Sequence, residues 1–298
     1  MKRVLLTGAN GFIGRQAIAP LHEKGYEIHA VSNIAPTADL IYENVVWHKT
    51  NLLDATEIDN MCEKVRASHL LHFAWYVEHG KFWNAPENEI WTAASLNLLA
   101  SFQKNGGERI VMAGTCAEYE WGKDAILSES KTPLNAANLY GKCKLELQKK
   151  LAASGASWAW GRVFFLYGEF ESPRRLIASV INSLLRDEFA DCSHGNQARD
   201  FMYVKDVADA FVALLDSGVE GCVNIASGEA ATIKEIVLTI ADQLDRREKV
   251  RFGTVPTAPD EPPSIVADIA RLRDEVGWKP RYNLRQGIAE TIEWWKNQ

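Results

Sequence analysis

Short apolar runs and longer amphipathic segments alternate over the first 165 residues of the chain. The runs at residues 3–7, 69–74 and 109–113 are largely apolar, which predicts short strands buried on both faces of a sheet. Between them, segments such as residues 57–66 and 89–104 carry apolar positions at helical spacing. Strands that alternate with helices in this way predict an α/β fold with a doubly wound parallel sheet and helices on both faces.

A glycine-rich turn lies between the first predicted strand and the first helix, which we expect at residues 16–24. Its glycines are spaced G-x-x-G-x-x-G over residues 8–14. Glycines in such a turn let the backbone approach a pyrophosphate closely, and the helix N-terminus offers N–H donors and a positive dipole. The turn predicts a Rossmann-type dinucleotide-binding unit, with cofactor contacts from Gly8, Asn10, Gly11, Phe12, Ile13 and Gly14.

The end of the second predicted strand, at Ser32 and Asn33, bears on the choice of dinucleotide. An Asp or Glu at this place hydrogen-bonds the ribose 2′-hydroxyl of NAD and repels the 2′-phosphate of NADP. Ser32 and Asn33 carry no negative charge, and both side chains can donate a hydrogen bond to a phosphate. We therefore expect NADP(H) as the favoured cofactor, with NAD(H) possible, because no Arg follows at once to clamp a phosphate.

The regular alternation ends near Glu171. Apolar positions over residues 176–185 mark one helix face, and residues 203–215 predict a strand end followed by a helix that returns to the first domain. We expect a dinucleotide-binding domain at residues 1–165, with a returning segment near residues 200–216. A smaller C-terminal α/β domain at residues 166–298 is expected to bind the substrate.

Tyr140 and Lys144 stand four residues apart at the start of a predicted helix, so they share one helix face. A nearby ammonium favours the phenolate and lowers the pKa of a tyrosine, which suits acid–base work. The pair alone is a weak signal, since both residues are common on solvated helix faces. Its context is informative, because Thr115 follows the fifth predicted strand at the carboxyl end, where open α/β sheets bind ligands.

Composition and charge exclude several classes of protein. The 298 residues are 47% hydrophobic and carry a net charge of −6, which argues against nucleic acid as the main partner. No apolar run approaches the ~20 residues of a membrane span, and no signal peptide is expected. The five cysteines are scattered without C-x-x-C spacing, so we expect reduced thiols in a cytoplasmic protein and no metal site.

Taken together, the motifs resemble those of the extended short-chain dehydrogenases/reductases of the NAD-dependent epimerase/dehydratase family, which act on nucleotide-linked sugars. The resemblance covers nearly the whole chain. It rests on the glycine turn, His72-Phe73-Ala74, Thr115, Tyr140-x-x-x-Lys144, Tyr167-Gly168, Arg199-Asp200-Phe201, Val204-x-Asp206-Val207-Ala208, Gly277-Trp278-x-Pro280 and Trp294-Trp295.

The resemblance assigns roles to the three candidate catalytic residues. Tyr140 would exchange the proton of the reacting sugar oxygen, Thr115 would hydrogen-bond that oxygen, and Lys144 would hold the nicotinamide ribose and lower the pKa of the tyrosine. A nucleotide-diphosphate sugar is the expected substrate, and a homodimer is the expected assembly. Further cofactor contacts are expected from Asn51, Leu52, Phe73 and Ala74, and substrate contacts from Trp75, Cys116, Phe165 and Arg199. Trp83 and Trp91 could line the sugar pocket with Trp75, although large aromatic side chains more often belong to a core.

Departures from the family pattern narrow the reaction. The 4,6-dehydratases that resemble this chain carry Asp-Glu directly after the catalytic Thr, where this chain has Cys116-Ala117. The GDP-fucose synthase type needs a Cys at the position of Ala117. The 4-epimerases usually show Asp at the end of the second strand and Asn in the segment that corresponds to residues 164–166, which is apolar here.

These differences favour an oxidoreductase that reduces a 4-keto(-6-deoxy) nucleotide sugar, with hydride from the nicotinamide and a proton from Tyr140. The alternative is a nucleotide-sugar 4-epimerase that holds NAD tightly. A non-catalytic NADP-sensing regulator is a remote alternative, since such relatives typically lose the tyrosine or the lysine.

Overall fold

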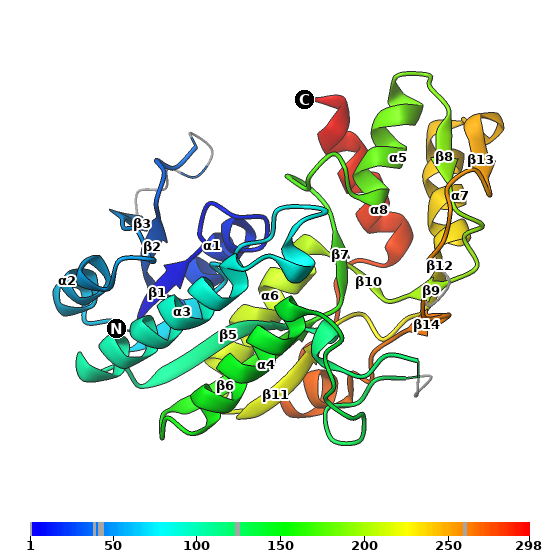
Figure 1. Ribbon diagram of the computed structural model, residues 1–298. Coiled ribbons are helices and arrows are strands. Elements are labelled where there is room, and N and C mark those ends of the chain that lie inside the picture. Colours follow the sequence, from blue (N-terminus) through cyan, green and yellow to red (C-terminus); the bar gives the residue numbers. More distant parts are fainter. Residues whose placement is uncertain (1, 38–39, 41–44, 123–125, 259–260) are drawn as a thin grey trace.

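A seven-stranded parallel sheet forms the centre of the N-terminal part of the protein (Figure 1). The computed structural model describes residues 2–37, 40, 45–122, 126–258 and 261–298. The sheet order is β11-β6-β5-β4-β1-β2-β3. Its strands are β1 (Arg3–Thr7), β2 (Glu27–Ser32), β3 (Val45–Lys49), β4 (His69–His72), β5 (Arg109–Thr115), β6 (Ser157–Val163) and β11 (Gly221–Ile225). The order reverses between β1 and β4, which is where such sheets bind ligands.

Helices cover both faces of this sheet, as the alternating pattern predicts. One face packs against α1 (Gly14–Glu23) and α6 (Val204–Asp216), and the other against α2 (Ala55–Val65), α3 (Glu87–Lys104) and α4 (Leu139–Ala152). The central residues of strand β1 are apolar because they face both cores. Val4 and Leu6 belong to the first of these cores and Leu5 to the second. Successive side chains of a strand point to opposite faces, so a doubly covered strand needs apolar residues at every position.

A smaller C-terminal layer stands beside the carboxyl ends of the sheet strands (Figure 1). Helices α5 (Leu176–Leu185), α7 (Ile233–Leu244) and α8 (Leu284–Lys296) surround a separate apolar core. Short strands complete this part: β7 (Phe165–Tyr167) with β10 (Phe201–Tyr203), β8 (Ala190–Cys192) with β13 (Val250–Phe252), and β9 (Ala198–Arg199) with β12 (Ala231–Thr232) and β14 (Ser264–Ile265). Within the described residues, no helix is both long and apolar enough to cross a membrane.

The part of the chain that returns to the sheet extends beyond the segment near residues 200–216 that the sequence predicts. Helix α6 covers the predicted returning segment near residues 200–216, and β11 then pairs in parallel with β6, with Val223 opposite Gly161. Gly161 allows this close packing, because a Cβ there would meet the ring of Phe211 on α6. The last strand of the sheet thus comes from beyond the first 165 residues.

Candidate active site

The glycine turn after β1 has a backbone that only glycine fits. Gly8 adopts a positive φ of 68°, and its carbonyl accepts a hydrogen bond of 2.8 Å from the N–H of Gly11. A Cβ on Gly14 would collide with the Gly8 carbonyl, and a Cβ on Gly8 would meet the backbone of Ala74. The turn therefore packs directly against the end of β4 and begins α1 at Gly14, so the N-terminus of α1 lies beside the carboxyl ends of the strands.

The neighbouring residues fit a dinucleotide. The side-chain nitrogen of Asn10 donates to the carbonyl of Ala35 at 3.0 Å and to Ser32 Oγ at 3.4 Å, whereas its buried Oδ1 has no partner among the described residues. Asn33 follows Ser32 and is exposed, and Asn51 lies just beyond β3, the strand next to β2. A glycine cradle at a helix N-terminus suits a pyrophosphate, and the unpartnered amide oxygen can accept a hydrogen bond from a hydroxyl or amino group of the adenosine.

The residues predicted to be catalytic lie together. Thr115 ends β5 and Tyr140 lies in the first turn of α4, whose N-terminus is capped by the Asn138 side chain. Burial raises the pKa of the Tyr140 phenol, and the nearby side chain of Thr115 lowers it in opposition. Both residues line a cavity of about 480 Å³ that also includes Lys144 and the glycine turn.

The sequence suggests Tyr140 as the partner of the Lys144 ammonium, but the structure places the ammonium against Ala113 and Trp75. Its ammonium donates to the carbonyl of Ala113 at 2.8 Å and lies 3.7 Å from the centre of the Trp75 ring. The residue is only 4% exposed, and this burial lowers the pKa of the ammonium to about 7. For Tyr140, burial raises the pKa, and the groups that lower it are the Thr115 side chain and the charge of Arg175.

Trp75 is held in turn by Asn88. The indole N–H donates to Asn88 Oδ1 at 2.9 Å, and the Asn88 amide nitrogen donates to the carbonyls of Phe82 and Ala85. The buried amide therefore fixes both the ring that faces Lys144 and the loop that carries Phe82. A ring face 3.7 Å from an ammonium stabilises the charged form of that ammonium.

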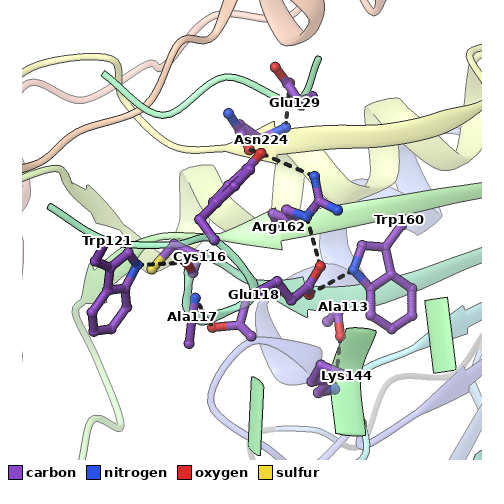
Figure 2. Close-up of polar contacts among 12 residues, drawn as sticks. Ala113, Cys116, Ala117, Glu118, Trp121, Glu129, Lys144, Trp160, Arg162 and Asn224 are labelled. Atoms are coloured by element: carbon purple, nitrogen blue, oxygen red, sulfur yellow. Dashed lines mark hydrogen bonds and ion pairs between the residues drawn. The ribbon is translucent and has the colours of Figure 1, made fainter. Parts of the chain in front are cut away.

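A buried ion pair holds the end of β5 (Figure 2). Glu118 accepts hydrogen bonds from the backbone N–H of Thr115 at 2.8 Å and from the indole N–H of Trp160 at 2.9 Å. Its second oxygen accepts from Arg162 Nε at 2.7 Å, and both charged side chains are fully buried. Glu118 was not among the site residues predicted from the sequence, although Thr-x-x-Glu spacing is the signature of a capping box, which the structure contains here.

The network continues from Arg162 across the sheet (Figure 2). Arg162 Nη1 donates to the Tyr119 hydroxyl at 3.1 Å, and that hydroxyl donates to Asn224 Oδ1 at 2.8 Å. The Asn224 amide nitrogen donates to the carbonyls of Leu127 and Asp268, both at 3.0 Å. Strands β5, β6 and β11 and two loops are thus joined by one chain of buried hydrogen bonds next to Thr115.

Aromatic side chains form one wall of the cavity. Phe82 and Trp83 meet the Tyr140 ring edge-on at centroid distances of 5.0 and 6.0 Å, and Trp121 contacts Trp83 at 6.4 Å. Of the three tryptophans considered from the sequence, Trp75 and Trp83 line the cavity, whereas Trp91 packs against the core beneath α2, α3 and α4.

Of the other residues expected to contact the cofactor or the substrate, some line the cavity and some do not. Phe73, Ala74, Cys116 and Phe165 line the cavity, and burial raises the pKa of the Cys116 thiol to about 12, so this group stays neutral. Leu52 is buried in the core on the α2 side of the sheet.

Arg199 lies behind the cavity wall, 5.6 Å from the centre of the Phe165 ring, and its guanidinium is engaged by Glu261 at 2.8 Å and by the carbonyls of Ala198 and Pro262. The predicted substrate contact of Arg199 would have to be made while the guanidinium is paired with Glu261.

Two charged residues that the sequence analysis did not select also line the cavity, namely Glu171 and Arg175. They lie in the segment between β7 and α5, where no motif of the sequence marks a polar site. Among the described residues, no group of three or more His, Cys, Asp or Glu side chains is placed to hold a metal ion.

Comparisons with known proteins agree with this geometry. Residues 4–226 match the model of the NAD dependent epimerase/dehydratase family. A UDP-glucose 4-epimerase of Rhizobium leguminosarum bv. trifolii is 27% identical over 98% of this chain and 96% of its own length.

Solved structures are similar over their whole length. The UDP-glucose 4-epimerase of Thermotoga maritima, solved with UDP-glucose, has a TM-score of 0.90 at 20% identity and 99% coverage of both chains. MoeE5, solved with UDP-glucuronic acid and NAD, has a TM-score of 0.84 at 25% identity and covers 100% of this chain and 99% of its own.

Replacing Tyr140 with Phe tests the catalytic group directly. The variant keeps the ring contacts with Phe82 and Trp83 but loses the exchangeable proton, so kcat should fall by roughly 10²- to 10⁴-fold without loss of folding. Steady-state kinetics and thermal unfolding measure both effects. Tyr76, which is partly buried and does not line the cavity, is changed to Phe as the matched control and should keep wild-type kcat; a similar kcat for Tyr140→Phe would exclude Tyr140 as the proton-transfer group.

Changing Glu118 to Gln should leave the Arg162 charge buried without its counter-ion. Because breaking a buried pair leaves an uncompensated charge, the free energy of unfolding should fall by about 3–5 kcal/mol, as measured by urea titration. Asp274→Asn, which breaks the exposed Arg273–Asp274 pair, serves as the control and should unfold at an unchanged urea concentration. Equal unfolding midpoints for the two variants would mean that the Glu118–Arg162 pair contributes nothing.

Changing Trp75 to Leu should alter the titration of Lys144. Loss of the ring face removes an interaction with the charged form, so the pKa of Lys144 should drop below about 7. An activity that needs the ammonium would then decline at lower pH, with the alkaline limb of kcat/KM shifted down by roughly 0.5–1 unit. Trp83→Leu, which changes the wall next to Tyr140 instead, should leave this limb in place. An unchanged limb in Trp75→Leu would refute the coupling.

Proposed function

The chain belongs to the NAD-dependent epimerase/dehydratase family, and from this premise we propose that it is an NAD-dependent 4-epimerase of a nucleotide-diphosphate sugar. The observation that carries the proposal is the grouping of Thr115, Tyr140 and Lys144 in one cavity with the glycine turn. The similarity to a UDP-glucose 4-epimerase over nearly the whole chain supports the reaction type and makes a UDP-hexose the first substrate to test. The same residues argue against a non-catalytic sensor.

Each residue of the candidate site has a defined part in this proposal. The glycine turn and Asn10 hold the dinucleotide, and Lys144 holds the ribose of its nicotinamide half. A bound nicotinamide supplies the position that accepts a hydride from a sugar carbon and returns it. Tyr140 takes the proton of the C4 hydroxyl and gives it back, while the Thr115 hydroxyl fixes that oxygen by a hydrogen bond.

Epimerisation also requires that the oxidised sugar present either face of C4 to the same cofactor. The cavity of about 480 Å³ has an apolar side formed by Phe164, Phe165 and Leu166. Apolar surface makes no directional hydrogen bonds, so this side accepts a sugar ring in more than one orientation. Cys116 and Ala117 supply no acid–base couple after Thr115, which speaks against elimination of water.

A second candidate is the NADPH-dependent reduction of a 4-keto-6-deoxy nucleotide sugar. It is favoured by the end of β2, where Ser32 and the exposed Asn33 place no carboxylate that would repel a 2′-phosphate. The two candidates use the same proton-transfer group and differ in whether the cofactor is kept or exchanged in each turnover.

The deciding experiment is an assay with UDP-glucose, without added cofactor, on the purified protein. The epimerase predicts conversion to the C4 epimer, detected by NMR, and release of NAD when the protein is denatured. The reductase predicts no such conversion, and instead a stoichiometric loss of NADPH absorbance with a 4-keto-6-deoxy nucleotide sugar. That second result would overturn the proposal.

We also propose that the protein is a cytoplasmic homodimer. Helices α3 and α4 pack side by side on the outside of the sheet, and Ile90 on α3 is 53% exposed. All five cysteines are free, which suits a reducing compartment. Light scattering of the purified protein would distinguish a dimer from a monomer.

A further inference from the structure

Glu171 places a carboxyl group in the wall of the catalytic cavity. It lies between β7 and α5 and lines the same cavity as Tyr140, although the residue is only 4% exposed. Among the described residues that line this cavity, no other Asp or Glu is present. Arg175, whose charge lowers the pKa of Glu171, lines the same cavity, as do the apolar side chains of Leu176, Ile177 and Phe201.

The backbone before Glu171 is held in one conformation. Phe170 has a positive φ of 66°, which is uncommon for a residue with a side chain. Its ring packs between Trp294, at a centroid distance of 4.8 Å, and the guanidinium of Arg15, 3.4 Å from the ring centre. The N–H of Glu171 donates to the carbonyl of Gly168 at 3.3 Å. The backbone that carries Glu171 is thus held by contacts on both sides of the turn.

In the described part of the chain, the carboxyl group of Glu171 lacks a hydrogen-bond partner for one of its two oxygens. Its Oε2 is buried and has no hydrogen-bond partner among the described residues. A hydrogen bond from the Gly168 backbone and the charge of Arg175 both lower the pKa of Glu171, but burial prevails and raises it to about 8. At neutral pH the group is therefore mostly protonated, and it can both donate and accept a hydrogen bond.

We propose that Glu171 is a ligand-binding residue that hydrogen-bonds a neutral polar group of the molecule held next to Tyr140. Buried polar atoms are nearly always paired, and an unpaired one beside a cavity finds its partner in what the cavity binds. The partner is a group with N–H or O–H and an acceptor oxygen, which is found both in a sugar hydroxyl and in the carboxamide of nicotinamide. The inference rests on the proposed function in so far as these are the two ligands of the cavity.

Two substitutions separate the hydrogen bond from the fold. Glu171→Gln keeps a donor and an acceptor in the same volume, whereas Glu171→Leu keeps much of the volume and removes both. Binding of NAD is followed by quenching of tryptophan fluorescence, and binding of UDP-glucose to the NAD complex by calorimetry. Glu171→Leu should weaken one of these two ligands by roughly tenfold or more, and Glu171→Gln should stay within about threefold of the wild type. The ligand that is weakened identifies the partner.

A neighbouring carboxylate provides the control. Glu169 is two residues away but pairs with Lys205 at 2.8 Å and with the hydroxyl of Tyr203 at 3.1 Å, on the side away from Tyr140. Glu169→Leu should lower the unfolding temperature and leave both affinities unchanged. Wild-type affinities for NAD and UDP-glucose in Glu171→Leu, with or without a lower unfolding temperature, would overturn the inference.

The outcome is independent of whether the proposed reaction is correct. If the wild type binds NAD and UDP-glucose but converts no nucleotide sugar, the proposed function fails, and the two affinities of Glu171→Leu still decide: weaker binding of either ligand supports the inference, and unchanged binding of both refutes it.

Discussion

The buried ion pair between Glu118 and Arg162 is the constraint on which the catalytic geometry depends. One carboxylate oxygen receives the backbone N–H of Thr115 and the indole of Trp160, while the other receives the guanidinium of Arg162. Taking both charges out of water is costly, and the cost is recovered only when every remaining donor is satisfied. Tyr119 accepts a further hydrogen bond from Arg162 and donates one to Asn224, so the end of β5 is tied to β6 and β11.

This arrangement places the reactive groups, and the hydroxyl of Thr115 also accepts a hydrogen bond of 3.2 Å from the backbone N–H of Ala117 in the short helix that follows. The hydroxyl of Thr115 remains directed at Tyr140, because Glu118 holds the backbone of Thr115. Lys144 is placed in a similar way by the Ala113 carbonyl and by a tryptophan ring that Asn88 holds from behind. The result is a buried ammonium with a pKa of about 7 and a phenol whose pKa burial raises. Changes in these two environments when ligands bind would act directly on proton transfer.

Much of the fold could be predicted from local pattern. The strand β1, the glycine turn and the helix α1 could be predicted because the buried centre of a parallel strand is apolar at successive positions and because Gly8 and Gly14 leave no room for a side chain. The grouping of Thr115, Tyr140 and Lys144 followed from the rule that ligands bind at the carboxyl ends of such strands. Partners far apart in the sequence could not be predicted: the contact of Trp75 with Lys144, the pairing of Arg199 with Glu261, and the placement of Glu171 in the cavity depend on tertiary packing.

A double-mutant cycle between Glu118→Gln and Thr115→Val tests most directly whether the ion pair acts on catalysis through Thr115. The four proteins are compared by kcat for the nucleotide sugar at a temperature at which all of them are folded. If Glu118 positions Thr115, the loss caused by Glu118→Gln should largely vanish once Thr115 lacks its hydroxyl, so the two effects are strongly non-additive. Additive losses in kcat would contradict the account, because the ion pair would then act on the reaction by a separate route.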